Sequence, residues 1–372
     1  MTQSPSGKTR SPAAAPGHLG PMVDESGRHQ RFEASDLAIV LSHYDLGVIE
    51  RIQPFRRGSR RAPKVRITTR HGEFLLKRRA VGKDDPYRVA FTHGLQLHLA
   101  QRGFPVPRLI GTRGHNNSML QHGGRTYELF EYISGQRYDR STAEAEQAGV
   151  TLGALHRLLA DHRPKYEPPT GTFHGLSEID ARLAMIPDAV AAVDNECDAA
   201  ALADTCAFLG DAYREAAKRV DETGYRRWAP CLVHGDWHPG NLLYQQRVVV
   251  SVLDFDSGRL ETRMADVANA ALQFSMKMGK VESPENWPDG LSIRLMKGLL
   301  IGYNQAAPRP ITPEERRALP WLMIEALILE SVLPIARVGL FGQINGLTFL
   351  QMVERKIRWI KPHVEKIVSL TE

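Results

Sequence analysis

The chain has 372 residues, of which 42% are apolar and 24% charged, and its formal net charge is +6. These fractions are typical of a globular protein with a sizeable core, built as one large domain or as two lobes. The three cysteines, Cys197, Cys206 and Cys231, form neither a disulfide framework nor a metal-ligand spacing. They indicate a reducing compartment, so we expect a cytoplasmic protein.

The N-terminal segment, residues 1–34, is rich in Ser, Pro, Gly and Ala and is predicted to be a disordered tail. It lacks the apolar stretch of a signal peptide. The most apolar run, residues 321–336, is interrupted by Glu325, Glu330 and Pro334, which argues against a membrane span. We therefore expect no membrane partner.

Positive charge is concentrated in residues 51–83, which hold twelve Lys and Arg against one acid, Glu73. This segment carries +11, and the rest of the chain carries −5, since 6 minus 11 is −5. Such a segment suggests a polyanionic partner, such as a nucleoside triphosphate, or else a basic face exposed to solvent. Nucleic acid is not expected, because the segment lacks interleaved aromatic residues and a groove-binding helix.

In chain order, the first predicted element is a short helix over residues 35–47, capped by Ser35 and ended by Gly47. Residues 64–69 and 73–79 then read as a β-hairpin in which Gly72 takes positive φ.

A strongly signalled helix follows over residues 84–103. Asp85 suits its N-cap, Pro86 its first turn and Gly103 its C-terminal stop. Residues 117–121 and 125–133 form a second predicted hairpin.

After SGQRYDR, residues 134–140, the pattern becomes helical. Ser141 and Glu144 have capping-box spacing at the start of a helix, and residues 176–222 and 262–372 are mainly helical. Between these blocks, residues 231–244 and 247–258 predict a compact two-strand element. The fold class is therefore α+β with two lobes: a small antiparallel β-rich lobe (35–133) and a larger helical lobe (134–372). A hinge near residues 132–135 joins them, and a ligand cleft is expected between them.

The stretch HGDWHPGN, residues 234–241, places polar residues between two apolar runs. His234, Asp236 and Asn241 have H-x-D-x-x-x-x-N spacing, and Asp254 ends the later run VLDFD. Phosphoryl transfer needs a carboxylate to orient the attacking hydroxyl and oxygen ligands for Mg²⁺. It also needs a cation for the phosphates, and Lys77 lies on a predicted strand of the small lobe.

Together HGDWHPGN, VLDFD and MADVANAA (264–271) resemble the aminoglycoside phosphotransferase family, which includes homoserine and choline kinases. The resemblance covers about residues 35–350. It implies a protein-kinase-like fold, ATP as donor, Mg²⁺ as cofactor and a small-molecule hydroxyl as acceptor.

The resemblance also implies roles for individual residues. Asp236 would be the catalytic base, His234 would brace the loop, and Asp266 would hold the loop's backbone. Asn241 and Asp254 would bind Mg²⁺. The nucleotide would be bound by Lys77, by Gly58 and Ser59 in the phosphate-covering loop, and by backbone groups of Glu131, Tyr132 and Ile133.

One feature departs from the family. The helix over 84–103 usually supplies a Glu to pair with the lysine, but residues 87–101 contain no acid. Thr92, His93 or Gln96 could hydrogen-bond Lys77 instead, or Asp254 could position it.

Several residues have a structural alternative. His234 and His238 have a zinc spacing, but Pro239 and Gly240 argue against the helix that it needs. His156 is expected to be a buried packing residue, and Asp256 to brace its loop rather than bind metal. Trp237 could line the acceptor pocket or pack beneath the loop.

The apolar helix over 320–334 contains two acids, Glu325 and Glu330, and a buried carboxylate needs a partner. An internal arginine, Arg294 or Arg337, could supply it, or one of the acids could bind a substrate ammonium. We therefore expect a small-molecule kinase acting on an amino alcohol, a homoserine-like acceptor or an amino sugar. A Ser/Thr protein kinase or an inactive nucleotide-binding scaffold of the same fold remain alternatives.

Overall fold

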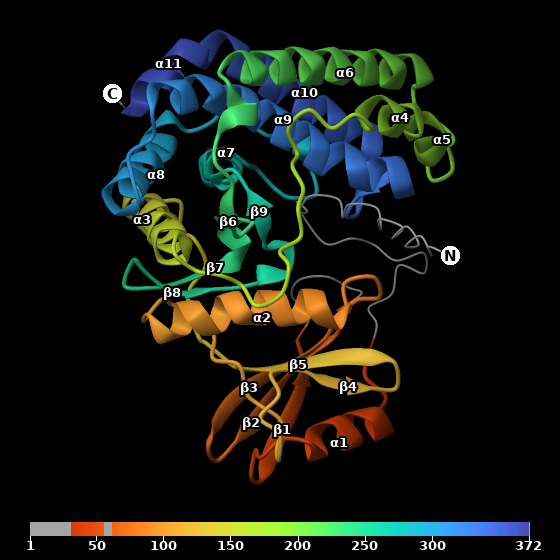
Figure 1. Ribbon diagram of the computed structural model, residues 1–372. Coiled ribbons are helices and arrows are strands. Elements are labelled where there is room, and N and C mark those ends of the chain that lie inside the picture. Colours follow the sequence, from red (N-terminus) through yellow and green to blue (C-terminus); the bar gives the residue numbers. More distant parts are fainter. Residues whose placement is uncertain (1–30, 56–61, 372) are drawn as a thin grey trace, which may run out of the picture.

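The computed structural model describes residues 31–55 and 62–371 (Figure 1). The predicted tail therefore lies outside the described residues as far as residue 30, and so does the loop that holds Gly58 and Ser59.

The small lobe is built on a five-stranded sheet with the order β1-β2-β3-β5-β4, in which all neighbours are antiparallel. Its strands are β1 (Ile49–Pro54), β2 (Lys64–Thr69), β3 (Gly72–Arg78), β4 (Leu120–His122) and β5 (Arg125–Glu131). The two predicted hairpins are β2–β3 and β4–β5. Gly72 takes a φ of +138° in the first turn, as predicted.

Helix α1 (Ala34–Ser42) packs beside this sheet, and its Val40 and Leu41 join the apolar cluster of the small lobe. The predicted Ser35 cap is wrong: Glu33 is the N-cap residue, in extended conformation, and Ser35 lies inside the first turn.

Helix α2 (Pro86–Gln101) begins and ends as predicted. The side chain of Asp85 accepts a hydrogen bond of 2.8 Å from the Arg88 N–H, and Gly103 takes a φ of +73° past the end of the helix. Its Phe91, Leu95 and Leu99 belong to the core of the large lobe. The helix therefore joins the two lobes.

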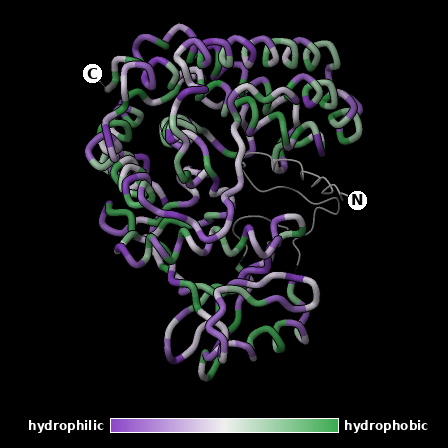
Figure 2. Tube along the Cα trace, viewed as in Figure 1, coloured by the Kyte–Doolittle hydropathy of each residue, from purple (hydrophilic) through white to green (hydrophobic). Residues whose placement is uncertain are grey.

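The large lobe is mainly helical. Its helices are α3 (Thr142–Leu159), α4 (Ile179–Ala184), α5 (Ile186–Ala191), α6 (Ala199–Glu222), α7 (Arg263–Ser275), α8 (Ile293–Ala306), α9 (Pro313–Val338), α10 (Gly346–Ile360) and α11 (Val364–Val368). Hydrophilic and hydrophobic residues alternate along the outer helix α6 in Figure 2, as expected of a helix that buries one face. Ser141 caps α3, but the Glu144 carboxylate accepts from the Asp139 N–H, so only half of the predicted capping box forms.

Helix α9 is largely buried within this lobe. Among the described residues it is the one helix long and apolar enough to cross a membrane by length and composition. However, 83% of that stretch is buried inside the protein. Its apolar character is therefore explained by its place in the core.

Two small antiparallel ladders lie where the lobes meet. β7 (Leu242–Gln245) pairs with β8 (Val248–Val252), and β6 (Cys231–Val233) pairs with β9 (Arg259–Glu261). The single two-strand element predicted here is thus two ladders, because the chain after β8 turns back to pair with β6. Figure 1 shows β7 and β8 next to α2, on the side of the large lobe that faces the sheet.

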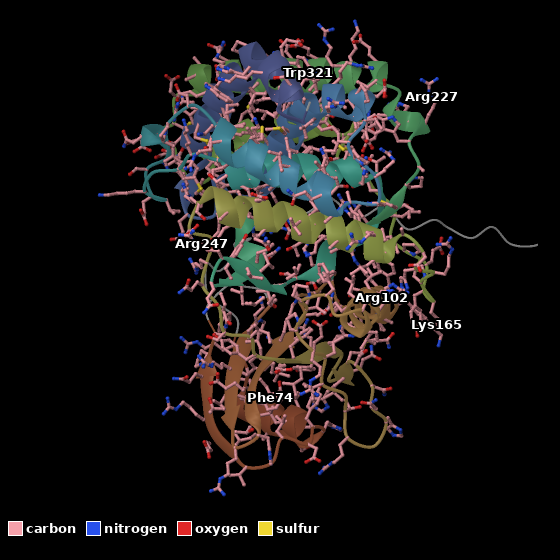
Figure 3. The ribbon with its side chains drawn as sticks, turned by 90° about the vertical axis from the view of Figure 1, so that its left-hand side faces the viewer. Phe74, Arg102, Lys165, Arg227, Arg247 and Trp321 are labelled. Atoms are coloured by element: carbon pink, nitrogen blue, oxygen red, sulfur yellow. The ribbon has the colours of Figure 1, made fainter. Side chains whose placement is uncertain are left out.

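The two lobes lie one after the other along the long axis of the molecule. Phe74 lies in the small lobe, and Trp321 lies towards the far end of the large lobe (Figure 3). The chain passes from β5 to α3 through residues 132–141. The fold is a protein-kinase-like two-lobe α+β fold.

Candidate active site

The loop after β6 is held by a buried carboxylate on α7. Asp266 accepts hydrogen bonds of 2.8 Å from the backbone N–H groups of both His234 and Gly235. Gly235 takes a φ of +76°, and a Cβ there would collide with the Arg259 guanidinium and the Ser257 carbonyl. Only glycine fits this turn, which brings the loop close to the segment before β9.

His234 is fully buried beneath the loop. Its Nε2 lies 3.0 Å from the Leu253 carbonyl, and its Nδ1 accepts from the Asp236 N–H at 3.3 Å. The ring of Trp237 is also fully buried and perpendicular to that of His234, with centroids 5.4 Å apart. Trp237 therefore packs beneath the loop, which is one of the two positions predicted for it.

Asp236 lies in the middle of the loop and is held by its neighbours. Asn241 Nδ2 donates to the Asp236 carbonyl (3.0 Å) and to its carboxylate Oδ2 (3.1 Å), and His238 Nε2 lies 3.7 Å from Oδ2. Burial works against ionisation of Asp236, but the charges of His238, His234 and Lys83 outweigh it and lower its pKa. Asp236 is therefore a carboxylate at neutral pH.

The two histidines have different partners within the protein. His238 caps the short turn η2 (Pro239–Asn241), where its Nδ1 accepts from the Gly240 N–H at 3.0 Å. In the described part of the chain, no group of three or more His, Cys, Asp or Glu side chains could hold a metal ion.

Asn241 and Asp254 are brought together by the β7–β8 hairpin. The Leu253 N–H donates to the Asn241 carbonyl at 2.8 Å, which extends the ladder to the residue before Asp254. Asp254 has the left-handed backbone conformation (φ +58°, ψ +68°), which is uncommon outside glycine. One carboxylate and one amide oxygen next to the loop are hard donors, so the pair fits Mg²⁺.

Lys77 points from β3 towards two acids of the large lobe and one acid of its own sheet. Its Nζ lies 2.7 Å from Asp256 Oδ2, 3.4 Å from Asp254 Oδ1 and 3.9 Å from Glu128 Oε2. Burial works against its charge, but these three carboxylates outweigh it and raise the pKa of Lys77. Of the predicted partners, Asp254 is thus one, whereas no hydrogen bond joins Lys77 to Thr92, His93 or Gln96 in the described chain.

Two residues of this cluster were not predicted from the sequence. Arg79 is almost fully buried and bridges Glu128 Oε1 (2.8 Å) and Asp256 Oδ1 (3.0 Å). Asp256 therefore braces its loop through Lys77 and Arg79, as expected. The signals were present in the sequence: Glu128 is a charged residue within an apolar strand, and Arg79 follows Lys77 at the two-residue spacing of a strand face.

This cluster also explains part of the basic segment over 51–83. Lys77 and Arg79 are buried and paired with acids, and Arg66 makes a short two-pronged contact with Glu73 (2.6 Å to each oxygen). These cations are therefore not one continuous face exposed to solvent.

The segment after β5 holds the residues expected to face adenine. The N–H groups of Glu131 and Tyr132 donate to the carbonyls of Arg108 and Glu73, each at 2.9 Å. Within the described chain no partner is found for the Ile133 N–H. Among these three N–H groups, that of Ile133 is thus the one best placed for a ligand.

The two acids of α9 have different environments. Glu325 is paired with His174, whose Nδ1 lies 2.9 Å from Oε2, and it also accepts from the Gly175 N–H at 2.9 Å. Its internal partner is thus a histidine rather than the predicted arginine. Arg294, one of those arginines, donates to Thr142 Oγ1 instead.

Glu330 lies near the catalytic loop. It lines a small cavity with Gly235, Asn269 and Arg259, and its carboxylate accepts from Gln273 Nε2 at 2.9 Å. Burial, together with the negative charge of Asp236, raises the pKa of Glu330 well above its usual value. The Oδ1 atom of Asn269 is buried without a hydrogen-bond partner. The cavity therefore offers two acceptor groups to a donor.

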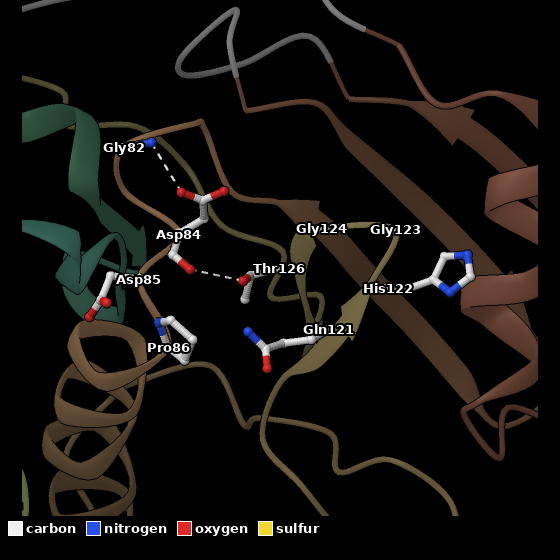
Figure 4. A pocket seen from close by; sticks show the side chains of 9 residues that line it. All are labelled: Gly82, Asp84, Asp85, Pro86, Gln121, His122, Gly123, Gly124 and Thr126. Atoms are coloured by element: carbon white, nitrogen blue, oxygen red, sulfur yellow. Dashed lines mark hydrogen bonds between the residues drawn. The ribbon is translucent and has the colours of Figure 1, made fainter.

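A second hollow lies in the small lobe, between the start of α2 and the β4–β5 hairpin (Figure 4). Its two carboxylates are already used: Asp84 accepts from the Gly82 N–H at 3.0 Å, and Asp85 caps α2. None of the predicted catalytic residues lines it.

The structure combines a two-lobe fold with a carboxylate held by hydrogen bonds, two hard oxygen donors and a buried lysine. These features define a class of enzyme, the phosphotransferases. Residues 51–322 match the model of the phosphotransferase enzyme family, and the chain belongs to this family.

Individual relatives are more distant. The homoserine kinase of Zymomonas mobilis is 24% identical over 237 residues, which cover 63% of this chain and 65% of that enzyme. The chain thus matches slightly less than two thirds of this relative's length.

Solved structures show the same fold. The amicoumacin kinase hAmiN, in complex with AMP-PNP, Ca²⁺ and Ami, aligns with a TM-score of 0.64 at 14% identity, covering 89% of this chain and 95% of that one. A microcompartment-associated aminopropanol kinase aligns with a TM-score of 0.63 at 15% identity, covering 91% of this chain and 100% of that one.

Proposed function

We propose that this protein transfers the γ-phosphoryl group of MgATP to a hydroxyl of a small molecule that carries an ammonium group. The position of Asp236 supports this most directly. It is ionised and held by Asn241, one of the two hard oxygen donors, and the other donor, Asp254, contacts the lysine that a nucleoside triphosphate requires.

Asp236 would orient the acceptor hydroxyl and take its proton as the oxygen bonds to phosphorus. Asn241 and Asp254 would hold Mg²⁺, which supplies positive charge at the phosphates. Lys77 would neutralise the α- and β-phosphates, and backbone groups of residues 131–133 would bind adenine. Gly58 and Ser59 would cover the phosphates. The AMP-PNP in the amicoumacin kinase complex is consistent with a triphosphate donor.

Glu330 supports an acceptor with an ammonium group. Its carboxylate lies in a cavity beside Gly235, and the charge of Asp236 reaches it. A substrate ammonium between the two acids would take the place of the proton that Glu330 keeps and would give Asn269 Oδ1 a donor. Homoserine and aminopropanol, the acceptors named for two related proteins, are both amino alcohols.

The free thiols bear on the cellular compartment in which the protein works. Cys197, Cys206 and Cys231 are all free, which supports the cytoplasm as the working compartment.

The test is an ATP-consumption assay against homoserine, choline, an amino sugar, a neutral polyol and a Ser/Thr peptide, with and without Mg²⁺. We expect Mg²⁺-dependent turnover with an amine. In Asp236→Asn, which keeps the side chain's shape, turnover should fall by about 10²–10⁴ while ATP still binds. Wild-type turnover in this variant would contradict the assignment, and a peptide as the best acceptor would indicate a protein kinase.

A further inference from the structure

Lys77 and Glu128 are direct partners across the sheet. The antiparallel register of β3 and β5 places them opposite each other, so their side chains lie on the same face. Both side chains are buried, Glu128 completely, and Lys77 Nζ lies 3.9 Å from Glu128 Oε2. The pairing of β3 with β5 therefore holds the two side chains near each other.

The two oxygens of Glu128 have different surroundings. Oε1 accepts from Arg79 at 2.8 Å and lies 2.6 Å from His93 Nε2. Oε2 is buried and has no hydrogen-bond partner in the described part of the chain. A buried carboxylate oxygen without a donor is costly, and Lys77 Nζ forms an ion pair with this oxygen at 3.9 Å.

Lys77 instead donates to acids of the large lobe, Asp256 and Asp254. Asp254 is the proposed Mg²⁺ ligand, and Asp256 belongs to the other lobe; Arg79 pairs with Asp256 as it does with Glu128. Glu128 is the one acid of the three that shares a sheet with Lys77 and lies wholly inside the protein.

We propose that Glu128 is the carboxylate that positions Lys77 for the nucleotide phosphates, and that His93 of α2 holds Glu128 in place. The inference rests on the nucleotide-binding role proposed for Lys77. An acid on β5 thus takes the place of the acid that the helix lacks. The helix acts on the lysine through the imidazole of His93, which donates from Nε2 to the Glu128 carboxylate and whose Nδ1 lies 2.8 Å from the Ser118 hydroxyl.

Glu128 is charged under working conditions. Burial alone would raise its pKa, but Arg79, Lys77 and His93 outweigh burial and lower the pKa to about 2. When Lys77 turns from Asp256 towards the phosphates, Glu128 Oε2 can accept one of its three N–H groups. The lysine then keeps a fixed partner in its own lobe.

Glu128→Gln tests the proposal, because it keeps the shape and removes the charge. We expect kcat to fall about 10- to 100-fold from misplacement of the lysine, and the affinity for AMP-PNP to weaken. The matched control is Glu315→Gln on α9, a buried glutamate paired with Arg263 and Arg309 whose pKa is likewise lowered to about 2. It should lower the thermal stability and leave kcat and AMP-PNP affinity unchanged.

A double-mutant cycle separates positioning from general damage. If Glu128 acts through Lys77, then Lys77→Met with Glu128→Gln will be no slower than Lys77→Met alone. Effects that multiply would overturn the proposal. If Lys77→Met itself has wild-type kinetics and AMP-PNP affinity, the proposed nucleotide role of Lys77 fails instead.

His93 provides a second route in case Glu128→Gln does not fold. His93→Leu removes the donor to Glu128, whereas His93→Gln keeps one. We expect the Leu variant to lose kcat and AMP-PNP affinity in the same direction as Glu128→Gln, and the Gln variant to recover most of both. Equal, wild-type values in both variants would overturn the proposal.

Discussion

Asp266 and His234 are joined by a hydrogen bond of 2.8 Å from the His234 backbone N–H to Oδ2, and Oδ1 accepts from the next N–H along the chain. One buried side chain on α7 thus fixes the backbone immediately before Asp236. The same carboxylate lies 3.1 Å from Nε2 of the buried His156, whose Nδ1 contacts the Tyr303 hydroxyl at 2.9 Å. The position of the proposed base therefore depends on the core of the large lobe, and His156 is the packing residue that was expected.

Asp266→Asn should loosen the loop without touching substrate. An amide has one acceptor oxygen, so one of the two backbone N–H groups would lose its partner and face an NH₂ group. We expect a loss of stability of about 1–3 kcal/mol and a fall in kcat of up to about 10²-fold, with little change in KM for ATP. Denaturant unfolding and steady-state kinetics measure both.

The control is Asp289→Asn, at an exposed carboxylate paired with Arg355. It should behave as wild type in both measurements. If Asp266→Asn also left the stability and kcat unchanged, the loop would be held by contacts other than this carboxylate.

The sequence allowed the loop and its hairpins to be predicted because their signals are local. Asp85 and Pro86 define the start of α2 within a few residues, and Gly235 and Asn241 belong to one short motif. Such features depend on backbone geometry that neighbouring residues determine.

The partners of the buried acids could not be predicted in this way. Lys77 lies beside Glu128 because of the register of β3 and β5, and beside Asp256 because the two lobes are in contact there. Neither contact can be inferred from a short stretch of sequence. Glu325 likewise meets His174, 151 residues away in the chain. Charge and burial indicated that partners must exist, but only the tertiary fold selects them.

Glu330 should make the protein less stable as the pH rises. Burial and the charge of Asp236 raise its folded-state pKa, so the folded chain keeps a proton that the unfolded chain releases above about pH 4.3. The stability linked to this proton is complete below that pH and is lost as the pH rises towards the folded-state pKa.

Glu330→Gln removes this dependence. We expect the variant to match wild type near pH 4 and to exceed it at pH 8 by at least about 1 kcal/mol, because one pKa unit corresponds to about 1.4 kcal/mol. Thermal unfolding from pH 4 to pH 8 measures the difference. Glu315→Gln should show the opposite sign, because the pKa of Glu315 is lowered to about 2. A Glu330 variant less stable than wild type at pH 8 would mean that the carboxylate is ionised and paired.

The last prediction concerns acceptor choice, and it distinguishes the two acids of α9. Glu330 lines the cavity beside the catalytic loop, whereas Glu325 is occupied by His174 and the Gly175 N–H. Glu330→Gln should therefore reduce the preference in kcat/KM for an amino alcohol over its deaminated analogue by about 10- to 100-fold, the value of a hydrogen bond to a charged group. Glu325→Gln, the matched control on the same helix, should leave that ratio unchanged. Because an ammonium would bind the ionised form of Glu330, amine binding should release a proton, and the wild-type preference should grow with pH below the raised pKa. A ratio that neither substitution changes would mean that the acceptor is recognised elsewhere and that Glu330 has only a structural role.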